Sequence, residues 1–273
     1  MRILIPTDFT ELSDFATIMA DKLKSTGETE VHFLHIVEWG YTEEDASGSI
    51  QVAEGDDTQF LVKKLVEAKT KMDSLKSRRP GDTFHILFGP RTQTLVEYAE
   101  SNHFDLIIMG TKGATGLTRW LSGSETQHIA RISKVPVMSL MCNRSDLVIK
   151  NILIVHDFLD KPPVQMPLLK LLESSLGATS HLLYVSTEKN IYREDVEKRM
   201  NTFAELNGLS KTEFHLHADR DIASGVTHFN QMNNMDLLFI GTEGRRGLGR
   251  LLKSSVAEKL INNLYKPIIT FHI

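Results

Sequence analysis

An internal duplication constrains the fold of this chain more than any other feature of the sequence. Pro6-Thr7-Asp8-Phe9 matches Val155-His156-Asp157-Phe158, and Asp105–Thr111 (DLIIMGT) matches Asp236–Thr242 (DLLFIGT). The first match is offset by 149 residues (157 − 8) and the second by 131 (241 − 110), so the first half carries a net 18 extra residues (149 − 131). We expect all of these extra residues to lie between the second strand and the next helix of the first half. The chain should therefore contain two copies of one structural unit.

Each half alternates apolar runs of strand length with segments of helical spacing, which predicts an α/β fold with a parallel sheet covered on both faces. We divide the 273 residues into domains 1–144 and 145–273, joined by a short polar linker at 143–145. The expected strands span 2–7, 31–37, 83–88, 105–110, 135–141, 150–156, 180–186, 212–217, 235–241 and 267–272. The expected helices span 11–26, 58–78, 92–102, 124–133, 162–176, 191–207, 221–233 and 254–264.

A glycine-rich stretch follows the apolar run 106–109 and precedes a segment with helical spacing. It reads Gly110-Thr111-Lys112-Gly113, then nine residues, then Gly123-Ser124. A turn of this kind between a parallel strand and a helix is a common phosphate-binding site, because glycines allow close approach and the helix N-terminus attracts anions. The spacing fits neither a Walker loop nor the G-x-G-x-x-G dinucleotide pattern.

This G-x-x-G, nine-residue gap and G-S spacing resembles the nucleotide-binding signature of the universal stress protein family. The resemblance extends along nearly the whole chain, in two copies. It implies two Rossmann-like domains of the adenine nucleotide alpha hydrolase-like type, each with a five-stranded parallel sheet and helices on both faces. It also implies that the two halves pair through their last strands, 135–141 and 267–272, as an intrachain pseudo-dimer.

Resemblance to ATP-binding members of the family implies ATP, or AMP or ADP, as the ligand of the first half, with or without Mg. Asp8 and its neighbours would contact adenine and ribose, Ile36 would line the adenine slot and Met109 would lie near the ribose. The remaining residues would surround the phosphates. The implied set is Pro6, Thr7, Asp8, Ile36, Met109, Gly110, Lys112, Gly113, Gly123, Ser124 and Glu125.

Several of these residues also have a purely structural interpretation. Asp8 could cap the helix expected near Glu11, although the nearby glycine loop favours a ligand role. Ser124 with Gln127 forms a capping-box pattern. Lys112 is equally well explained as an exposed loop charge, and a carboxylate at Glu125 would repel a phosphate unless it points away.

The second half departs from the signature. Its loop reads Gly241-Thr242-Glu243-Gly244, then nine residues, then Ser254-Ser255, so a serine replaces the last glycine and Glu243 replaces Lys112. We therefore expect this half to bind ATP poorly or not at all. A basic cluster in the same loop could hold another anion or form a solvated face, and we favour the face; it comprises Arg245, Arg246, Arg250 and Lys253.

The sequence favours a nucleotide-binding regulatory protein over an enzyme. Efficient phosphoryl transfer needs a positioned metal, a nucleophile and concentrated positive charge, and we assign no catalytic residues and no metal ligands. Slow ATP hydrolysis or phosphotransfer is one alternative, and binding of a small molecule or lipid by the second half is another. His215 and His217 share one face of an expected strand, but no carboxylate partner is evident and only His272 could be brought near, so we interpret them as ordinary strand histidines.

The composition of the chain limits the kinds of molecule that it is expected to bind. A net charge of −4 and a pI near 6.3 argue against nucleic acid or an anionic membrane as partner. The single cysteine, Cys142, and the direct start of a strand after Met1-Arg2 predict a cytoplasmic protein without a signal peptide.

The insertion 39–59 contains six acidic residues and no Lys or Arg, so we expect it to be mobile or disordered. A protein partner that the sequence does not identify and a further homodimer both stay open.

Overall fold

The computed structural model of the chain describes residues 1–25, 27–38, 42–44, 50–52, 57–111, 123–158, 165–187, 193–242, 256, 259–261 and 264–272. The elements of the first half are β1 (Arg2–Pro6), α1 (Glu11–Lys24), β2 (Glu30–Val37), β3 (Thr42–Glu44), β4 (Ile50–Val52), α2 (Asp57–Arg78), β5 (Thr83–Phe88), α3 (Arg91–Ser101), β6 (Leu106–Gly110), α4 (Gly123–Ile132) and β7 (Val137–Leu140). Those of the second half are β8 (Asn151–Val155), α5 (Pro167–Leu176), β9 (Thr179–Ser186), α6 (Arg193–Leu206), β10 (Thr212–Ala218), α7 (Ile222–Asn233), β11 (Leu237–Thr242) and β12 (Ile268–His272).

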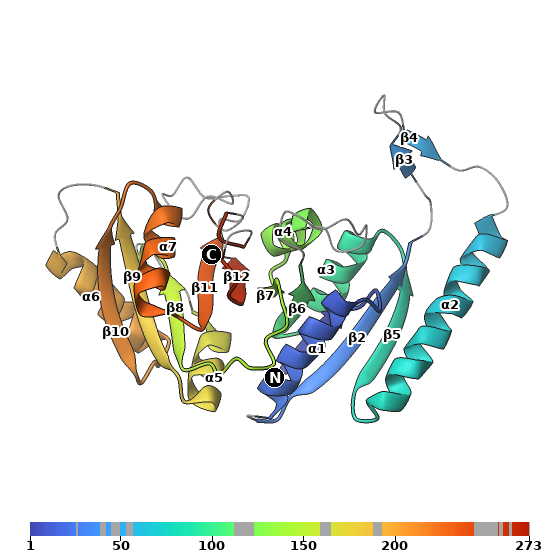
Figure 1. Cartoon of the computed structure of the whole chain (residues 1–273), viewed down its shortest axis with the longest axis horizontal. Helices are drawn as coiled ribbons and strands as arrows, with labels where there is room; N and C mark the ends of the chain where they lie inside the picture. The colour runs from blue at the N-terminus through green and yellow to red at the C-terminus, as the bar shows by residue number, and fades with distance from the viewer. Residues whose placement is uncertain are drawn as a thin grey trace.

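One ten-stranded sheet runs through both halves, in the order β10-β9-β8-β11-β12-β7-β6-β1-β2-β5. Within each half the five strands of this sheet pair in parallel, which confirms the expected five-stranded parallel arrangement with crossover helices. The halves meet where β7 and β12 pair antiparallel, with Met138 opposite Ile269. Figure 1 shows these two strands at the centre of the molecule. The expected pairing of the last strands is therefore confirmed.

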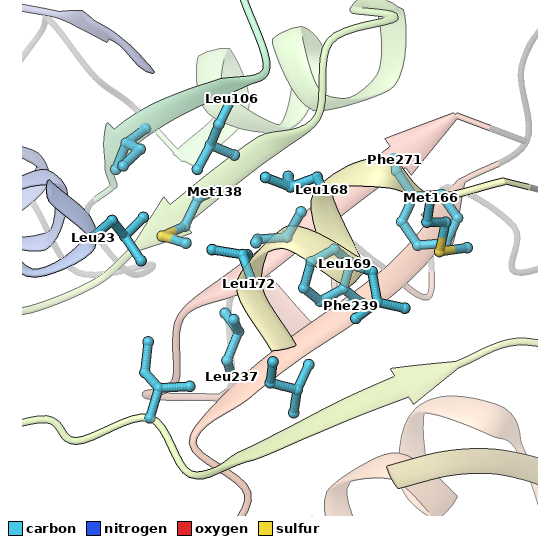
Figure 2. Packing of buried hydrophobic residues seen from close by; sticks show 14 of the residues in the cluster. Leu23, Leu106, Met138, Met166, Leu168, Leu169, Leu172, Leu237, Phe239 and Phe271 are labelled. Atoms are coloured by element: carbon cyan, nitrogen blue, oxygen red, sulfur yellow. The ribbon is translucent and has the colours of Figure 1, made fainter. Parts of the chain in front are cut away.

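The apolar residues form three clusters that follow the two faces of the sheet. On one face a single core runs through both halves and includes buried residues of α1, α2, α5 and α6. On the other face, α3 and α4 cover the first half and α7 covers the second, with a separate core in each. Figure 2 shows Met138 of β7 close to Leu23 of α1 and to the α5 residues Leu168 and Leu172. The continuous core and the paired strands join the two repeats into one body.

The helix boundaries differ from the predicted ones where proline or a cap decides them. The helix expected at 162–176 begins at Pro167, because proline fits the first helical position, and ends before Gly177 in a left-handed conformation. Residues 162–164 lie outside the described part of the chain. Of the helix expected at 254–264, residues 256 and 259–261 are helical and the others are not all described.

The 39–59 insertion contains regular structure, unlike our expectation of a mobile or disordered segment. β3 and β4 pair antiparallel as a short hairpin, with Thr42 opposite Val52, and Figure 1 shows this hairpin projecting from the end of α2. Antiparallel pairing lets the backbone N–H and C=O groups of these two short strands hydrogen-bond to each other. The extra residues are also not confined to the loop, because α2 has 22 residues whereas its counterpart α6 has 14.

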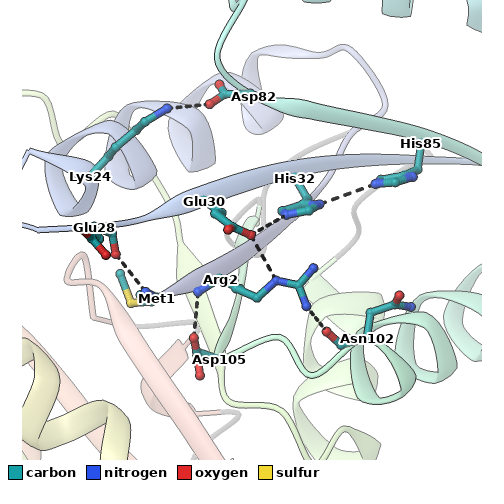
Figure 3. A network of polar contacts seen from close by, with 10 residues as sticks. All are labelled: Met1, Arg2, Lys24, Glu28, Glu30, His32, Asp82, His85, Asn102 and Asp105. Carbon is teal, nitrogen blue, oxygen red and sulfur yellow. Dashed lines mark hydrogen bonds and ion pairs between the residues drawn. The ribbon is translucent and has the colours of Figure 1, made fainter.

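Two acidic residues, Asp105 and Asp236, fix the amino ends of the central strands. The backbone N–H of Arg2 donates to Asp105 Oδ2 at 2.7 Å, and those of Lys150 and Asn151 both donate to Asp236 Oδ2 at 2.9 Å. Figure 3 shows the first of these contacts within a larger polar network. Both carboxylates hold neighbouring strands in register.

Among the described helices, none has the length and apolar character needed to cross a membrane.

Candidate functional site

A pocket lies at the carboxyl ends of β1, β2 and β6, which are adjacent in the sheet. In open parallel sheets this edge, at the point where the strand order reverses, is where ligands bind. Six of the eleven predicted site residues line this pocket together: Pro6, Thr7, Asp8, Ile36, Met109 and Glu125. Leu34, Arg91 and Leu95 complete it.

The turn after β1 orients Asp8. Its Oδ1 accepts hydrogen bonds from the backbone N–H of Thr10 at 3.0 Å and from the Ser13 hydroxyl at 2.8 Å. These bonds tie the turn to the start of α1 rather than capping the helix, because the N-cap position is Thr10. Among the described residues Asp8 Oδ2 has no hydrogen-bond partner, so this oxygen can accept a bond from a ligand.

The same turn carries local strain. Phe9 has a φ of 63°, which is rare for a non-glycine residue, and Phe158 at the matching place in the second half has a φ of 57°. The backbone N–H of Phe9 donates to the Thr7 hydroxyl at 3.0 Å, and that of Phe158 donates to His156 Nδ1 at 2.7 Å. The unusual turn therefore belongs to the repeated fold, and a side chain two residues earlier stabilises it in each half.

Gly110 has a packing role that the sequence did not suggest. A Cβ built on Gly110 would lie 2.1 Å from the backbone oxygen of Leu12. The missing side chain therefore allows α1 to approach the end of β6, which brings the Asp8 turn beside Met109. We had expected this glycine to make room for a phosphate.

A charged cluster separates the pocket from a neighbouring groove. Arg91, at the start of α3, forms ion pairs with Glu38 and with Glu125 of α4, the latter at 3.4 Å. Burial raises the pKa of Glu125 above its usual value, and the Arg91 guanidinium partly offsets this. Arg91 and Glu125 also line a groove of ≈ 500 Å³ between α3 and α4, where the exposed His128 lies as well.

The phosphate-binding part of the signature is only partly described. α4 begins at Gly123, one residue earlier than expected. Because α4 follows β6 and Glu125 of its first turn lines the pocket, the N–H groups of its N-terminus lie at this edge of the sheet. Lys112 and Gly113 lie outside the described residues, as do residues 243–255 of the second loop. Their predicted roles stay predictions.

The second half carries different residues at the positions that correspond to the pocket. His156 replaces Thr7, is buried, and stacks on Phe203 of α6 with ring centroids 5.7 Å apart. Val256 stands at the place of Glu125, and Ile222, the first residue of α7, at that of Arg91. The charged pair of the first pocket therefore has no counterpart in these positions of the second half.

Sequence reasoning did not identify Leu34, Arg91 or Leu95 as pocket residues, nor Glu38 as a partner of Arg91. Arg91 follows Gly89-Pro90 at the end of the third strand of the repeat, which is at the edge of the sheet where ligands bind. Its position at a helix start beside that edge was a usable signal. The side-chain contact with Glu38 was not predictable, because no motif links the two residues.

Comparisons with known proteins give a consistent result. The model of the universal stress protein family matches residues 1–140 and 149–272. The universal stress protein MJ0577 of Methanocaldococcus jannaschii is 29% identical over 149 residues, which cover 50% of this chain and 92% of that protein. The universal stress protein MJ0531 of the same organism is 30% identical over 140 residues, covering 50% of this chain and 79% of that protein.

Among solved structures, a universal stress protein from Archaeoglobus fulgidus has a TM-score of 0.74 at 17% identity and covers 99% of this chain and 98% of its own. This similarity concerns the fold and extends over both halves. The two family matches agree with the repeat in the sequence and with the two parallel sheets. The chain therefore belongs to the universal stress protein family, with two copies of the family's domain in tandem.

Proposed function

We propose that the first half binds ATP or a related adenine nucleotide, AMP or ADP, with or without Mg, and that the protein is a stress-response regulator that responds to this ligand. The observation that carries the proposal is the pocket itself. Six residues implied by the nucleotide-binding signature come from distant parts of the sequence and line one pocket at the ligand-binding edge of the sheet.

Each part of the pocket suits a different part of a nucleotide. Leu34, Ile36 and Met109 are buried and offer an apolar surface to a base. Asp8 Oδ2 can accept a hydrogen bond from a ribose hydroxyl or an exocyclic amino group. The N-terminus of α4 suits phosphates, and we keep Gly110, Lys112, Gly113, Gly123 and Ser124 as the residues around them.

Nucleotide binding would require the charged cluster to move. The pocket has a cavity volume of ≈ 10 Å³, about enough for one water, whereas the adjacent groove has ≈ 500 Å³. Arg91 and Glu125 line both spaces. Rotation of these two side chains would join the pocket to the groove, and a freed Arg91 could then pair with phosphate oxygens.

We further propose an arrangement in which domains 1–144 and 145–273 act as an intrachain pseudo-dimer in the cytoplasm, with the second domain binding nucleotide weakly or not at all. The β7–β12 pairing and the shared core support this arrangement, and the presence of Ile222 and Val256 in place of Arg91 and Glu125 supports the loss of binding. We expect at most slow ATP hydrolysis and propose no catalytic residue.

Calorimetric titration of the full chain with ATP tests the proposal. We expect one ATP per chain, and Asp8→Asn should weaken binding about tenfold or more, because it replaces one carboxylate oxygen by an amide that cannot accept. Asp157→Asn is the matched control in the second half and should leave the affinity unchanged. Two ATP molecules per chain, or equal effects of the two substitutions, would contradict the proposal.

A further inference from the structure

Two histidine–carboxylate clusters lie along β10 and the residue after it, each with one member from a neighbouring element, β9 or α7, although the sequence showed no carboxylate partner for His215 or His217. The first comprises His181, Glu213 and His215, and the second comprises His217, Asp219 and His228. In each cluster one ligand atom from every residue lies within 4.8 Å of the others. The two clusters differ in whether the first half of the chain contains an equivalent.

The first cluster contains a pair that both halves share. His181 Nδ1 lies 3.0 Å from His215 Nε2, and in the first half His32 Nδ1 lies 3.4 Å from His85 Nε2. Figure 3 shows the His32–His85 pair beside Glu30. The rings are stacked in both halves, and Asn151 lies 3.1 Å from His181 Nε2. A pair that is repeated, stacked and already hydrogen-bonded is explained by the packing of the fold.

The second cluster exists in the second half alone. The strand registers of the two halves show that Leu87 is equivalent to His217 and Gly89 to Asp219. The backbone hydrogen bonds agree, because the N–H of Gly89 donates to Val37 as that of Asp219 donates to Ser186. The aromatic contacts of His85 with Tyr98 and of His215 with Phe229 align α3 with α7, so Glu97 corresponds to His228. The fold therefore forms without any of the three residues.

We propose that His217, Asp219 and His228 bind a zinc ion, with the fourth position open to water. Asp219 Oδ2 lies between the two rings, 3.6 Å from His217 Nε2 and 2.6 Å from His228 Nδ1. Tetrahedral zinc with bonds of about 2.0–2.1 Å separates its ligand atoms by about 3.3 Å. Small side-chain rotations would therefore convert the present contacts into a coordination sphere.

The surroundings hold the carboxylate in place for this role. Asp219 Oδ1 accepts from the backbone N–H of Arg220 at 2.7 Å, which leaves Oδ2 facing the two histidines. The Arg220 side chain turns to Ser224 and Asp221, at 3.2 and 3.4 Å, rather than to the cluster. Hydrogen bonds of this kind orient metal ligands in known sites.

A glycine exchange between the halves makes room for Asp219. In the first half Gly89 lies against Thr94, whose hydroxyl would be 2.5 Å from a Cβ on Gly89. In the second half Gly225 takes the place of Thr94, and a Cβ on it would lie 2.5 Å from a methyl carbon of Val185 and 3.2 Å from the Asp219 Cβ. The glycine at 225 therefore leaves space for Val185 and for the Asp219 side chain.

The ligand set favours zinc over Mg²⁺ or Ca²⁺, because two imidazole nitrogens and one carboxylate suit a borderline transition metal. The site is also accessible, since the His228 side chain is 55% exposed. A hydrogen bond at such an exposed position adds little stability. Fold stability alone therefore does not explain why the three residues converge.

Zinc titration of the full chain tests the proposal, after chelator treatment and in the absence of nucleotide and phosphate. We expect one zinc per chain at this site, and His217→Leu and His228→Ala should each weaken binding at least about tenfold. His217→Leu introduces the residue of the first half. Glu213→Gln, in the neighbouring cluster, should leave zinc affinity unchanged. Cobalt should give the intense visible absorption of a tetrahedral or five-coordinate site in the wild type and lose it in His228→Ala.

Thermal unfolding supplies a second readout. Zinc should raise the midpoint of the wild type and of Glu213→Gln, but not that of the two ligand variants. His228 is exposed, so His228→Ala keeps the test valid even if His217→Leu fails to fold. Unchanged zinc affinity in His228→Ala, loss of binding in Glu213→Gln instead, or no zinc binding by the wild type would each overturn the proposal.

Discussion

Gly110 offers the sharpest test of how the candidate site is built. A Cβ at this position would lie 2.1, 2.6 and 2.9 Å from the O, C and Cα atoms of Leu12. These are backbone atoms of α1, so no side-chain rotation can relieve the contact. The helix cannot retreat easily either, because Ala16, Met19 and Ala20 of α1 are fully buried against the sheet.

Gly110→Ala should therefore destabilise the protein strongly. Overpacking of a core by one methyl group costs about 1–3 kcal/mol, and a clash with fixed backbone should reach the upper end, about 3 kcal/mol. A displaced α1 would also move the Thr10 and Ser13 groups that hold Asp8. We thus expect ATP affinity to fall along with stability.

Urea unfolding followed by circular dichroism measures the effect, with Gly27→Ala as the matched control. A Cβ on Gly27 would meet no atom within 4 Å, so this substitution should change stability by no more than about 0.5 kcal/mol. Both substitutions reduce the freedom of the unfolded chain in the same way, so their difference isolates the clash. Equal unfolding midpoints for the two variants would refute the role assigned to Gly110.

Three further predictions concern charge, pH and the junction between the halves. Glu125→Gln should strengthen ATP binding about two- to tenfold, because it removes a carboxylate beside the phosphate site and frees Arg91; weaker binding in calorimetry would contradict this. Stability should fall as the pH drops below 6.5, because burial lowers the pKa of four histidines, so that the unfolded chain binds more protons; thermal midpoints that do not change between about pH 7.5 and about pH 5.5 would exclude this. The four are His35, His85, His181 and His215. Met138→Ala, in the fully buried core that both halves share, should cost about 2–5 kcal/mol in urea unfolding, whereas Met232→Ala, 67% exposed, should have little effect.

The repeat and the apolar runs were enough to predict the fold. Parallel strands buried on both faces consist of nearly continuous apolar residues, as in β6, where all five residues are buried. The pairing of 135–141 with 267–272 came from the family resemblance rather than from the strands themselves. The short β3–β4 hairpin was missed because an acidic, weakly apolar stretch gives little strand signal.

The site was harder to predict than the fold. Motifs located Asp8, Met109 and Glu125 at one edge of the sheet, because strand ends have sequence signals. The position of Arg91 between Glu38 and Glu125 depends on how α3 and α4 pack, and no local pattern encodes that distance. Likewise, His217 and His228 are brought together by the packing of α7 on β10, eleven residues along the chain.

The two halves act as an internal control for assigning roles. Both carry the stacked histidine pair and the left-handed phenylalanine after the first strand, so these features follow from the common fold and need no ligand. The Arg91–Glu125 contact occurs only in the first half, and the His217–Asp219–His228 cluster only in the second, within the described residues. Since the fold forms in each half without the other's cluster, stability requires neither. This difference is what makes both clusters candidates for binding, and it predicts that removing the His228 side chain will leave the fold intact.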